Sequence, residues 1–295
     1  MNYKITHTTR YLYDDTVPFC QNIVYLTPRD THNQRCGRHR LAVRPQPTVC
    51  HRRTDYFGNL SHAFSIDTGH KQLQITATSQ VELSALDLPK KEATPAWETV
   101  KQQLPQDKTA AGLDIFQFAF RSPYVPSVAD LADYGLQSFS PNRPVLDAIV
   151  DLNQRIHSDF QYDPHATNVN TPVTEVFDQR RGVCQDLAHL MLGCIRPLGL
   201  AARYVSGYLR TNPPKGKPRL IGADASHAWV SVFCGDIGWV DVDPTNNALP
   251  STQHITVAWG RDYGDVCPVA GMFVGGGSHK LSVSVDVEER YSQEG

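Results

Sequence analysis

A thiol, an imidazole and a carboxylate occur in this order along the chain, in contexts that suit nucleophilic catalysis. Cys184 stands where a loop pattern turns into an amphipathic helix, and His227 and Asp243 lie in two successive strand-like runs. A helix start favours the thiolate form of a cysteine because the helix dipole stabilises negative charge there. The sequence therefore predicts a thiol enzyme in which Cys184 attacks a carbonyl carbon, His227 accepts and returns a proton, and Asp243 orients the imidazole.

The two runs that carry His227 and Asp243 are predicted to form an antiparallel hairpin. Opposed residues in such a hairpin keep a constant sum of positions, so a tight turn centred on Gly235 would place His227 directly opposite Asp243. A register shift of two residues would leave both side chains on one face, diagonal to each other and within reach. Asp241 has the same parity and is the competing carboxylate, but Asp243 at the strand end gives the better opposition.

The oxyanion formed during acyl transfer needs hydrogen-bond donors that are already in position. The backbone N–H of Cys184 is predicted to be one donor because it lies at the helix start. Tyr162 and Gln161, which follow an earlier helical segment, are the candidates for the second donor. Trp229 shares a face with His227 and is a candidate for lining the substrate cleft, although a core position is the commoner outcome for a tryptophan.

The remaining cysteines and histidines are interpreted as structural. Seven cysteines without any C-x-x-C pair argue against a disulfide framework and structural zinc, and they favour a reducing compartment. No metal and no cofactor is predicted. Asp186, in the first turn of the Cys184 helix, either complements the helix dipole or orients a loop. The residues expected in core or other structural positions are Cys194, Cys234, His7, His39, His51, His62 and His189.

The composition predicts a folded, soluble protein of about two domains. The chain has 295 residues, of which 40% are hydrophobic and 20% charged. With 28 basic and 30 acidic side chains the formal net charge is -2, which indicates neither nucleic acid nor a membrane as a partner. No apolar run approaches the roughly 20 residues of a membrane span, and the first residues lack the apolar segment of a secretory signal. The predicted location is the cytoplasm.

Residues 1–90 are predicted to be a β-rich, sandwich-like N-terminal domain. Apolar and polar residues alternate at 73–83, which is the period-two pattern of a half-buried strand. Several short strands separated by turn residues are typical of an antiparallel sandwich. These shorter strands are expected at 3–13, 22–27, 40–44 and 59–66, with a turn at 55–59.

Residues 91–130 are predicted to be a linker or helical connection, and 131–295 to be an α+β core. In that core a helix that bears Cys184 packs on an antiparallel sheet, and Gly199 ends the helix. An earlier helix has Asn142 as its candidate N-cap.

Strands of the core are expected at 203–209, 225–233 and 239–243, and a C-terminal strand at 281–288 could join either domain. The basic, proline-containing stretch 211–219 is interpreted as a solvated loop. A run of glycines at 275–277 is interpreted as a flexible connector.

Four stretches of the core carry a family resemblance when they are taken together. They are GVCQDLAH at 182–189, GLAARYVSGY at 199–208, HAWV at 227–230 and VDPTN at 242–246. These motifs resemble the bacterial transglutaminase-like family, whose members are often described as proposed cysteine proteases. The stretches HTTRY at 7–11, LTPR at 26–29, DYFGN at 55–59 and GRDYGDV at 260–266 resemble the β-rich region that often precedes that core.

The resemblance implies a papain-like α+β core whose catalytic residues correspond to Cys184, His227 and Asp243. It also implies amide hydrolysis, with water as the acyl acceptor, as the default reaction of the bacterial members. Animal-type transglutaminases have tryptophan directly after the nucleophile, where this chain has Gln185, and they use calcium. The sequence has no clustered carboxylate loop that would bind calcium. This departure and Gln185 both weaken the assignment of calcium-dependent cross-linking.

Three function classes follow from the sequence. The leading one is a cysteine-dependent amide or peptide hydrolase with a protein or peptide substrate. Acyl transfer to an amine uses the same acyl-enzyme and differs only in whether water is excluded during its breakdown. A non-catalytic peptide-binding module is the third class, against which the intact set of nucleophile, base and orienting carboxylate argues.

Overall fold

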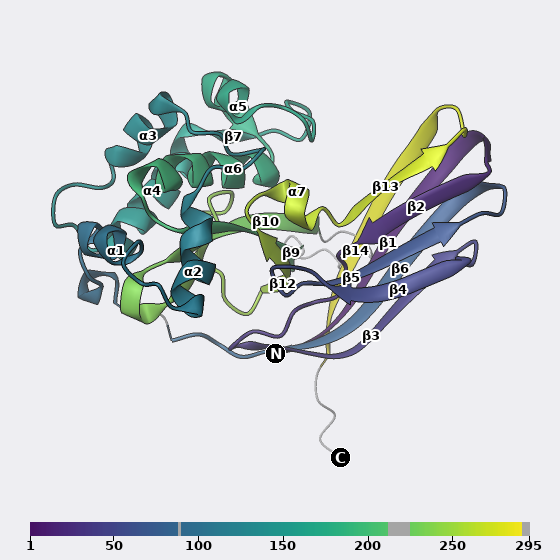
Figure 1. Cartoon of the computed structure of the whole chain (residues 1–295), viewed down its shortest axis with the longest axis horizontal. Coiled ribbons are helices and arrows are strands. Elements are labelled where there is room, and N and C mark those ends of the chain that lie inside the picture. The colour runs from purple at the N-terminus through teal and green to yellow at the C-terminus, as the bar shows by residue number, and fades with distance from the viewer. Residues whose placement is uncertain (88–89, 212–224, 291–295) are drawn as a thin grey trace, which may run out of the picture.

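The chain forms a helix-rich domain and a β-rich domain that lie side by side, as Figure 1 shows for the computed structural model. The structure describes residues 1–87, 90–211 and 225–290. The predicted α+β class, with a β-rich N-terminal part and a helix that packs on an antiparallel sheet in the core, is confirmed. Within the described residues no helix combines the length and the apolar character needed to cross a membrane.

The β-rich domain is a sandwich of two four-stranded antiparallel sheets. One sheet has the order β14-β1-β6-β3 and the other the order β13-β2-β5-β4. The strands are β1 (Asn2–Val17), β2 (Phe19–Val24), β3 (Gln34–Arg44), β4 (Val49–Thr54), β5 (Leu60–Ile66), β6 (His70–Leu83), β13 (Val269–Val274) and β14 (His279–Arg290). Side chains of both sheets, among them Phe64 and Ile75, form the core between them. The alternation expected at 73–83 is the buried and exposed pattern of β6.

Two strands from the C-terminal part of the chain complete this sandwich. β14 pairs with β1 along almost its whole length, from Asn2 opposite Arg290 to Tyr13 opposite His279, and β13 pairs with β2. The sequence placed this part of the chain with the core and left the destination of its last strand open. The glycines at 275–277 form the turn between β13 and β14, where each has a positive φ.

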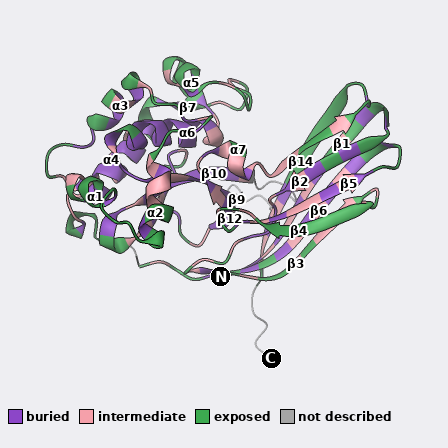
Figure 2. Ribbon diagram, viewed as in Figure 1, coloured by how far each residue is buried: buried purple, intermediate pink, exposed green. Residues whose placement is uncertain are grey.

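The helices belong to the other domain. They are α1 (Trp97–Gln103), α2 (Ala110–Phe116), α3 (Ala129–Leu136), α4 (Val145–Asp159), α5 (Val173–Gln179), α6 (Cys184–Ile195) and α7 (Tyr263–Val266), with short 3-10 turns at Lys91–Ala93, Gln117–Ala119, Arg196–Leu198 and Gly235–Ile237. α6 is buried along most of its length, which Figure 2 shows in purple. Gly199, at φ 86°, ends the 3-10 turn that follows α6. Asn142 does not cap α4, because its φ is 62° and the N-cap position is Pro144.

The core sheet has the strand order β11-β10-β9-β12 and is antiparallel throughout. Its strands are β9 (Ala202–Leu209), β10 (Ala225–Phe233), β11 (Trp239–Val242) and β12 (His254–Gly260), and a separate two-stranded pair joins β7 (Gln161–Tyr162) to β8 (Arg181–Gly182). α6 packs against β9 and β10, as the sequence predicted. β12 was not predicted. Beyond Thr211, the predicted basic loop at 211–219 lies outside the described residues.

Polar contacts fix the two domains to each other. The Asn59 side chain donates to the carbonyl of Trp259 at 2.8 Å and accepts from the backbone N–H of the same residue at 3.0 Å. The Arg29 guanidinium stacks over the Trp259 ring at 3.5 Å. Gln34 donates to the carbonyl of Thr256 at 2.7 Å and accepts from its N–H at 2.9 Å. The sandwich is therefore held against the edge strand β12 of the core sheet.

Candidate active site

Cys184 is the first residue of α6, and the turn before it is fixed by Asp186. The Asp186 carboxylate accepts hydrogen bonds from the Val183 backbone N–H at 2.8 Å and from the Thr167 hydroxyl at 2.6 Å. A Cβ atom on Gly182 would lie 2.8 Å from an Asp186 oxygen, so the close approach of this loop needs glycine. Of the two roles left open by the sequence, Asp186 therefore orients the loop, and it does so from the first turn of the helix. The Cys184 side chain is left partly exposed.

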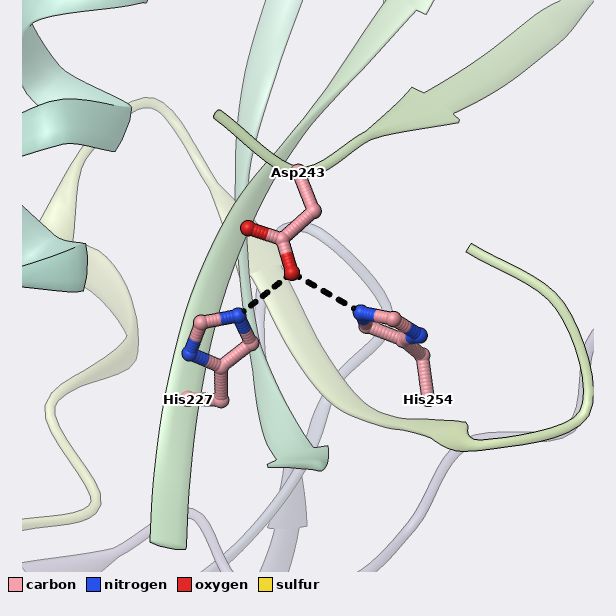
Figure 3. Close-up of side chains that lie close together, drawn as sticks. All are labelled: His227, Asp243 and His254. Atoms are coloured by element: carbon pink, nitrogen blue, oxygen red, sulfur yellow. Dashed lines mark hydrogen bonds and ion pairs between the residues drawn. The ribbon is translucent and has the colours of Figure 1, made fainter. Parts of the chain in front are cut away.

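His227 and Asp243 form a buried hydrogen-bonded pair. His227 Nε2 donates to Asp243 Oδ2 at 2.7 Å, and the two side chains are 6% and 0% exposed. The other ring nitrogen of His227 points away from Asp243, as Figure 3 shows, and is not used by the carboxylate. Burial alone would lower the pKa of His227, but its interactions with Asp243 and Cys184 outweigh this effect and raise the pKa to about 10.

The hairpin register differs from the simplest expectation. Val230 lies opposite Val242 and Ser231 opposite Asp241, so the turn centres one residue beyond Gly235. This register places Asp243 diagonal to His227 instead of directly opposite it. The direct opposition was therefore wrong, and the diagonal arrangement considered beside it is the one found.

The competing carboxylate, Asp241, does not contact His227. It accepts a hydrogen bond from the indole N–H of Trp229 at 2.9 Å. Trp229 is fully buried and is absent from the cleft that Cys184 and His227 line. Of the two positions considered for Trp229, a place in the cleft lining and a place in the core, the structure shows the core position.

A second histidine shares the Asp243 carboxylate, and the sequence analysis missed it. His254, the first residue of β12, donates from Nε2 to Asp243 Oδ2 at 3.0 Å, so the carboxylate lies between two imidazoles (Figure 3). The Asn246 side-chain amide donates to the same oxygen at 2.7 Å, and the backbone N–H groups of Thr245 and Asn246 donate to Oδ1 at 3.0 and 3.2 Å. These donors outweigh the effect of burial and hold the pKa of Asp243 well below its usual range.

The side chains of His227, Asp243 and His254 together offer three possible metal ligands. Their candidate ligand atoms lie within 4.8 Å of one another. However, the two nitrogen-to-oxygen distances are 2.7 and 3.0 Å, whereas ligands about 2.0–2.1 Å from a tetrahedral zinc ion would stand roughly 3.3 Å apart. The spacing fits hydrogen bonds between imidazole N–H groups and a carboxylate, and it is shorter than the ligand spacing around a tetrahedral zinc ion.

Cys184 and His227 line one cleft of about 490 Å³ at the junction of the two domains. Gln185 also lines this cleft, and its side-chain amide donates to the Val169 carbonyl at 3.2 Å. Gln161 and Tyr162 lie in β7, beside Arg181 and Gly182 of the loop that leads to Cys184. They line a neighbouring cavity of about 540 Å³ instead of the cleft itself. Burial, and after it the charge of Cys184, raise the pKa of Tyr162.

The other thiols differ from Cys184 in their surroundings. All seven cysteines are unpaired. Cys194 and Cys234 are fully buried, and burial raises the pKa of each to about 12, so these thiols are poor nucleophiles. His189 is buried as well, and its ring accepts the Tyr263 backbone N–H at 3.1 Å. These residues have the structural positions that the sequence indicated.

The comparisons with known proteins support a family of cysteine-dependent enzymes. The crystal structure of a proposed cysteine protease from Cytophaga hutchinsonii has the same fold, with a TM-score of 0.76 and 20% identity over 99% of this chain and 92% of that chain. Residues 3–82 match the bacterial transglutaminase-like N-terminal region, and residues 135–244, which include all three predicted catalytic side chains, match the transglutaminase-like superfamily.

Two curated relatives extend this comparison. The uncharacterized protein Rv2569c of Mycobacterium tuberculosis is 39% identical over 290 residues, which cover 97% of this chain and 92% of the relative. A protein-glutamine gamma-glutamyltransferase of Pseudomonas aeruginosa is 32% identical over 128 residues, which cover 42% of this chain and 19% of that enzyme. The chain belongs to the bacterial transglutaminase-like family.

Proposed function

We propose that the protein hydrolyses amide or peptide bonds through an acyl-enzyme on Cys184. The observation that carries this proposal is the buried His227–Asp243 pair, which leaves one imidazole nitrogen for the thiol in a cleft open to solvent. Asp243 accepts hydrogen bonds only, so His227 carries a proton on Nε2, and Nδ1 is the nitrogen that exchanges a proton with the sulfur. A protein or peptide of the cytoplasm is the proposed substrate.

The reaction proceeds by acyl transfer to sulfur and then to water. The Cys184 thiolate attacks the carbonyl carbon, and the backbone N–H of Cys184 donates to the oxyanion. The His227 imidazolium gives its Nδ1 proton to the leaving amine as the C–N bond breaks. His227 then accepts a proton from water as the water oxygen attacks the thioester, and the C–S bond breaks. The imidazolium and the thiolate are thereby restored.

Tyr162 is the proposed second oxyanion donor. It lies in β7, opposite Gly182 of the loop that leads to Cys184. Gln161 is the weaker candidate because its backbone N–H is already bonded to the Arg180 carbonyl at 2.8 Å. Tyr162→Phe should lower kcat more than it raises KM, because an oxyanion donor acts in the transition state.

A mixed peptide library tests the proposed reaction. The protein should release new amino termini from a subset of peptides, and Cys184→Ala should abolish this turnover while leaving the unfolding temperature nearly unchanged. Cys50→Ala is the matched control, because Cys50 is exposed and lies in β4 of the other domain. Turnover that survives in Cys184→Ala would contradict the proposal.

Acyl transfer to an amine is the second candidate reaction. It is favoured by the match to the Pseudomonas aeruginosa enzyme, whose name describes transfer from glutamine. The same acyl-enzyme would react with a primary amine in place of water. Adding a fluorescent primary amine to the library reaction decides between them: dominant amide product indicates a transferase, and dominant free acid indicates a hydrolase.

A further inference from the structure

The β-rich domain supplies one wall of the cleft that contains Cys184. β1 and β14 are long strands that run from the core to the outer end of the sandwich (Figure 1). Three cross-strand pairs of these strands line the cleft: His7 with Val285, Thr9 with Val283, and Tyr11 with Leu281. Because alternate residues of a strand share a face, these six side chains belong to one face of the sheet.

The apolar stripe on this face of β14 is covered at one end and open at the other. Val285 and Val287 are 2% and 0% exposed and belong to the core of the helix-rich domain. Leu281 and Val283, further along the same face, are 51% and 52% exposed. Neighbouring apolar side chains that stay uncovered beside a catalytic group are typical of a ligand-binding surface.

The described part of the cleft lining carries no formal charge of either sign apart from the catalytic groups. Among the lining residues that the structure describes, none is Asp, Glu, Lys or Arg. His7 is neutral near pH 7 because burial lowers its pKa to about 4. Its ring makes hydrogen bonds of 3.0 Å with the Tyr208 and Thr9 hydroxyls. A charged substrate side chain would lose its hydration here without gaining an opposite charge.

We propose that the acyl donor is a polypeptide segment with uncharged, apolar side chains next to the reactive carbonyl. Tyr11, Leu281 and Val283 form the subsite that selects these side chains. Specificity is therefore set by the β-rich domain, while the helix-rich domain performs the chemistry. This inference rests on the proposed function, since it names the substrate class of the same cleft. The cleft volume of about 490 Å³ is within the range of about 300–1,000 Å³ usual for ligand sites.

A pair of matched valines tests the subsite. Val283→Asp puts a carboxylate into the proposed subsite, and Val274→Asp puts one at an equally exposed valine (51% against 52%) of β13 that does not line the cleft. Both changes are made in the Cys184→Ala protein, and Kd is measured for neutral peptides with leucine, and for matched peptides with lysine, at the positions that flank the acyl carbonyl. Binding in this inactive background does not depend on turnover.

The expected result is a loss of at least tenfold in affinity for the leucine peptides with Val283→Asp, a gain for the lysine peptides, and no change with Val274→Asp. Equal Kd values for the two aspartate variants would overturn the inference, and so would a preference of the unmodified cleft for charged peptides.

Failure of the proposed function has a different signature. Active protein that binds leucine peptides but neither cleaves them nor transfers their acyl group would refute the chemistry and leave the subsite standing. Turnover with unchanged specificity in Val283→Asp would refute the subsite and leave the chemistry standing. Folding of the Val283→Asp protein is verified by its unfolding temperature, both in the Cys184→Ala background used for binding and in the active background used for turnover.

Discussion

Replacing Asp243 with asparagine keeps the shape of the side chain and removes its charge, so it isolates the role of the carboxylate. Oδ2 accepts from His227, His254 and the Asn246 side chain, and Oδ1 accepts from two backbone N–H groups. An asparagine NH2 group in the Oδ1 position faces the two backbone donors, and in the Oδ2 position it faces the other three. Every orientation therefore leaves at least two donors unpaired. With NH2 in the Oδ2 position, His227 can accept only through Nε2, so its Nδ1 carries the proton and cannot take that of Cys184.

The size of the effect follows from these lost hydrogen bonds. Of these hydrogen bonds only the one from His227 stabilises the imidazolium directly, and a hydrogen bond to a charged group contributes about 1.5–3 kcal/mol. At about 1.4 kcal/mol per factor of ten, its loss predicts a fall of about 10- to 10²-fold in every step that needs the His227 imidazolium. The direction of the change follows from the pKa of His227, which Asp243 helps to raise to about 10. Without the carboxylate the imidazolium loses its proton at lower pH.

Alkylation of Cys184 measures this effect without knowledge of the substrate. Iodoacetamide is applied between pH 5 and pH 10, and the rate at each cysteine is read by peptide mass spectrometry. Exposed Cys50, which lies in β4 of the other domain, is the internal reference. The protein should label Cys184 faster than Cys50 at pH 5, and Asp243→Asn should lose this advantage.

Asp241→Asn is the matched control for this experiment. Asp241 belongs to the same hairpin, but its carboxylate accepts from the Trp229 indole and does not contact His227. This variant should label Cys184 at the rate of the unchanged protein. Equal labelling of Cys184 at pH 5 in Asp243→Asn and in the unchanged protein would refute the reasoning.

Three further outcomes are expected. His254→Ala removes one donor from Asp243, so the pH 5 labelling rate of Cys184 should fall by about tenfold, as expected for one hydrogen bond of about 1.5 kcal/mol; an unchanged rate would remove His254 from the site. Because the pKa of Asp243 is lowered on folding, its carboxylate stabilises the protein above about pH 4 and loses this effect as the pH falls further. Thermal unfolding from pH 7 to pH 2 should therefore show a steeper acid loss than in Asp243→Asn, and parallel curves would contradict it. Gly207→Ala would place a Cβ 2.2 Å from the Ile255 carbonyl oxygen and 2.5 Å from the Trp229 ring, so urea unfolding should show a destabilisation of more than about 2 kcal/mol, and a loss below 0.5 kcal/mol would contradict this packing.

Local signals in the sequence were sufficient for much of the fold. The alternation at 73–83 is β6, and the apolar stripe from Cys184 onward is α6, because both patterns report the burial of a single element. The same holds for the shared face of His227 and Asp243, since a hairpin joins neighbours in the chain. The catalytic roles of Cys184, His227 and Asp243 stay a prediction that the experiments above address.

Long-range pairings could not be derived in this way. His254 reaches Asp243 only because β12 pairs with β9 instead of with β11, its neighbour in the chain. The β-branched and aromatic residues at 254–260 were a strand signal, but no local pattern states which strand is the partner. The same applies to β14, which pairs with β1 from the far end of the chain. β4 has all six residues exposed, so it shows no alternation from which a strand could be predicted.

The most direct test of the central claim is to capture the acyl group on the protein. A turned-over peptide, or an activated ester if none is known, is mixed with the protein, quenched in acid within milliseconds to seconds, and mapped by mass spectrometry. We expect one acyl group as a thioester on the peptide that contains Cys184, and none in Cys184→Ala. Turnover without an adduct on Cys184, or an adduct formed equally on exposed Cys50, would contradict the account.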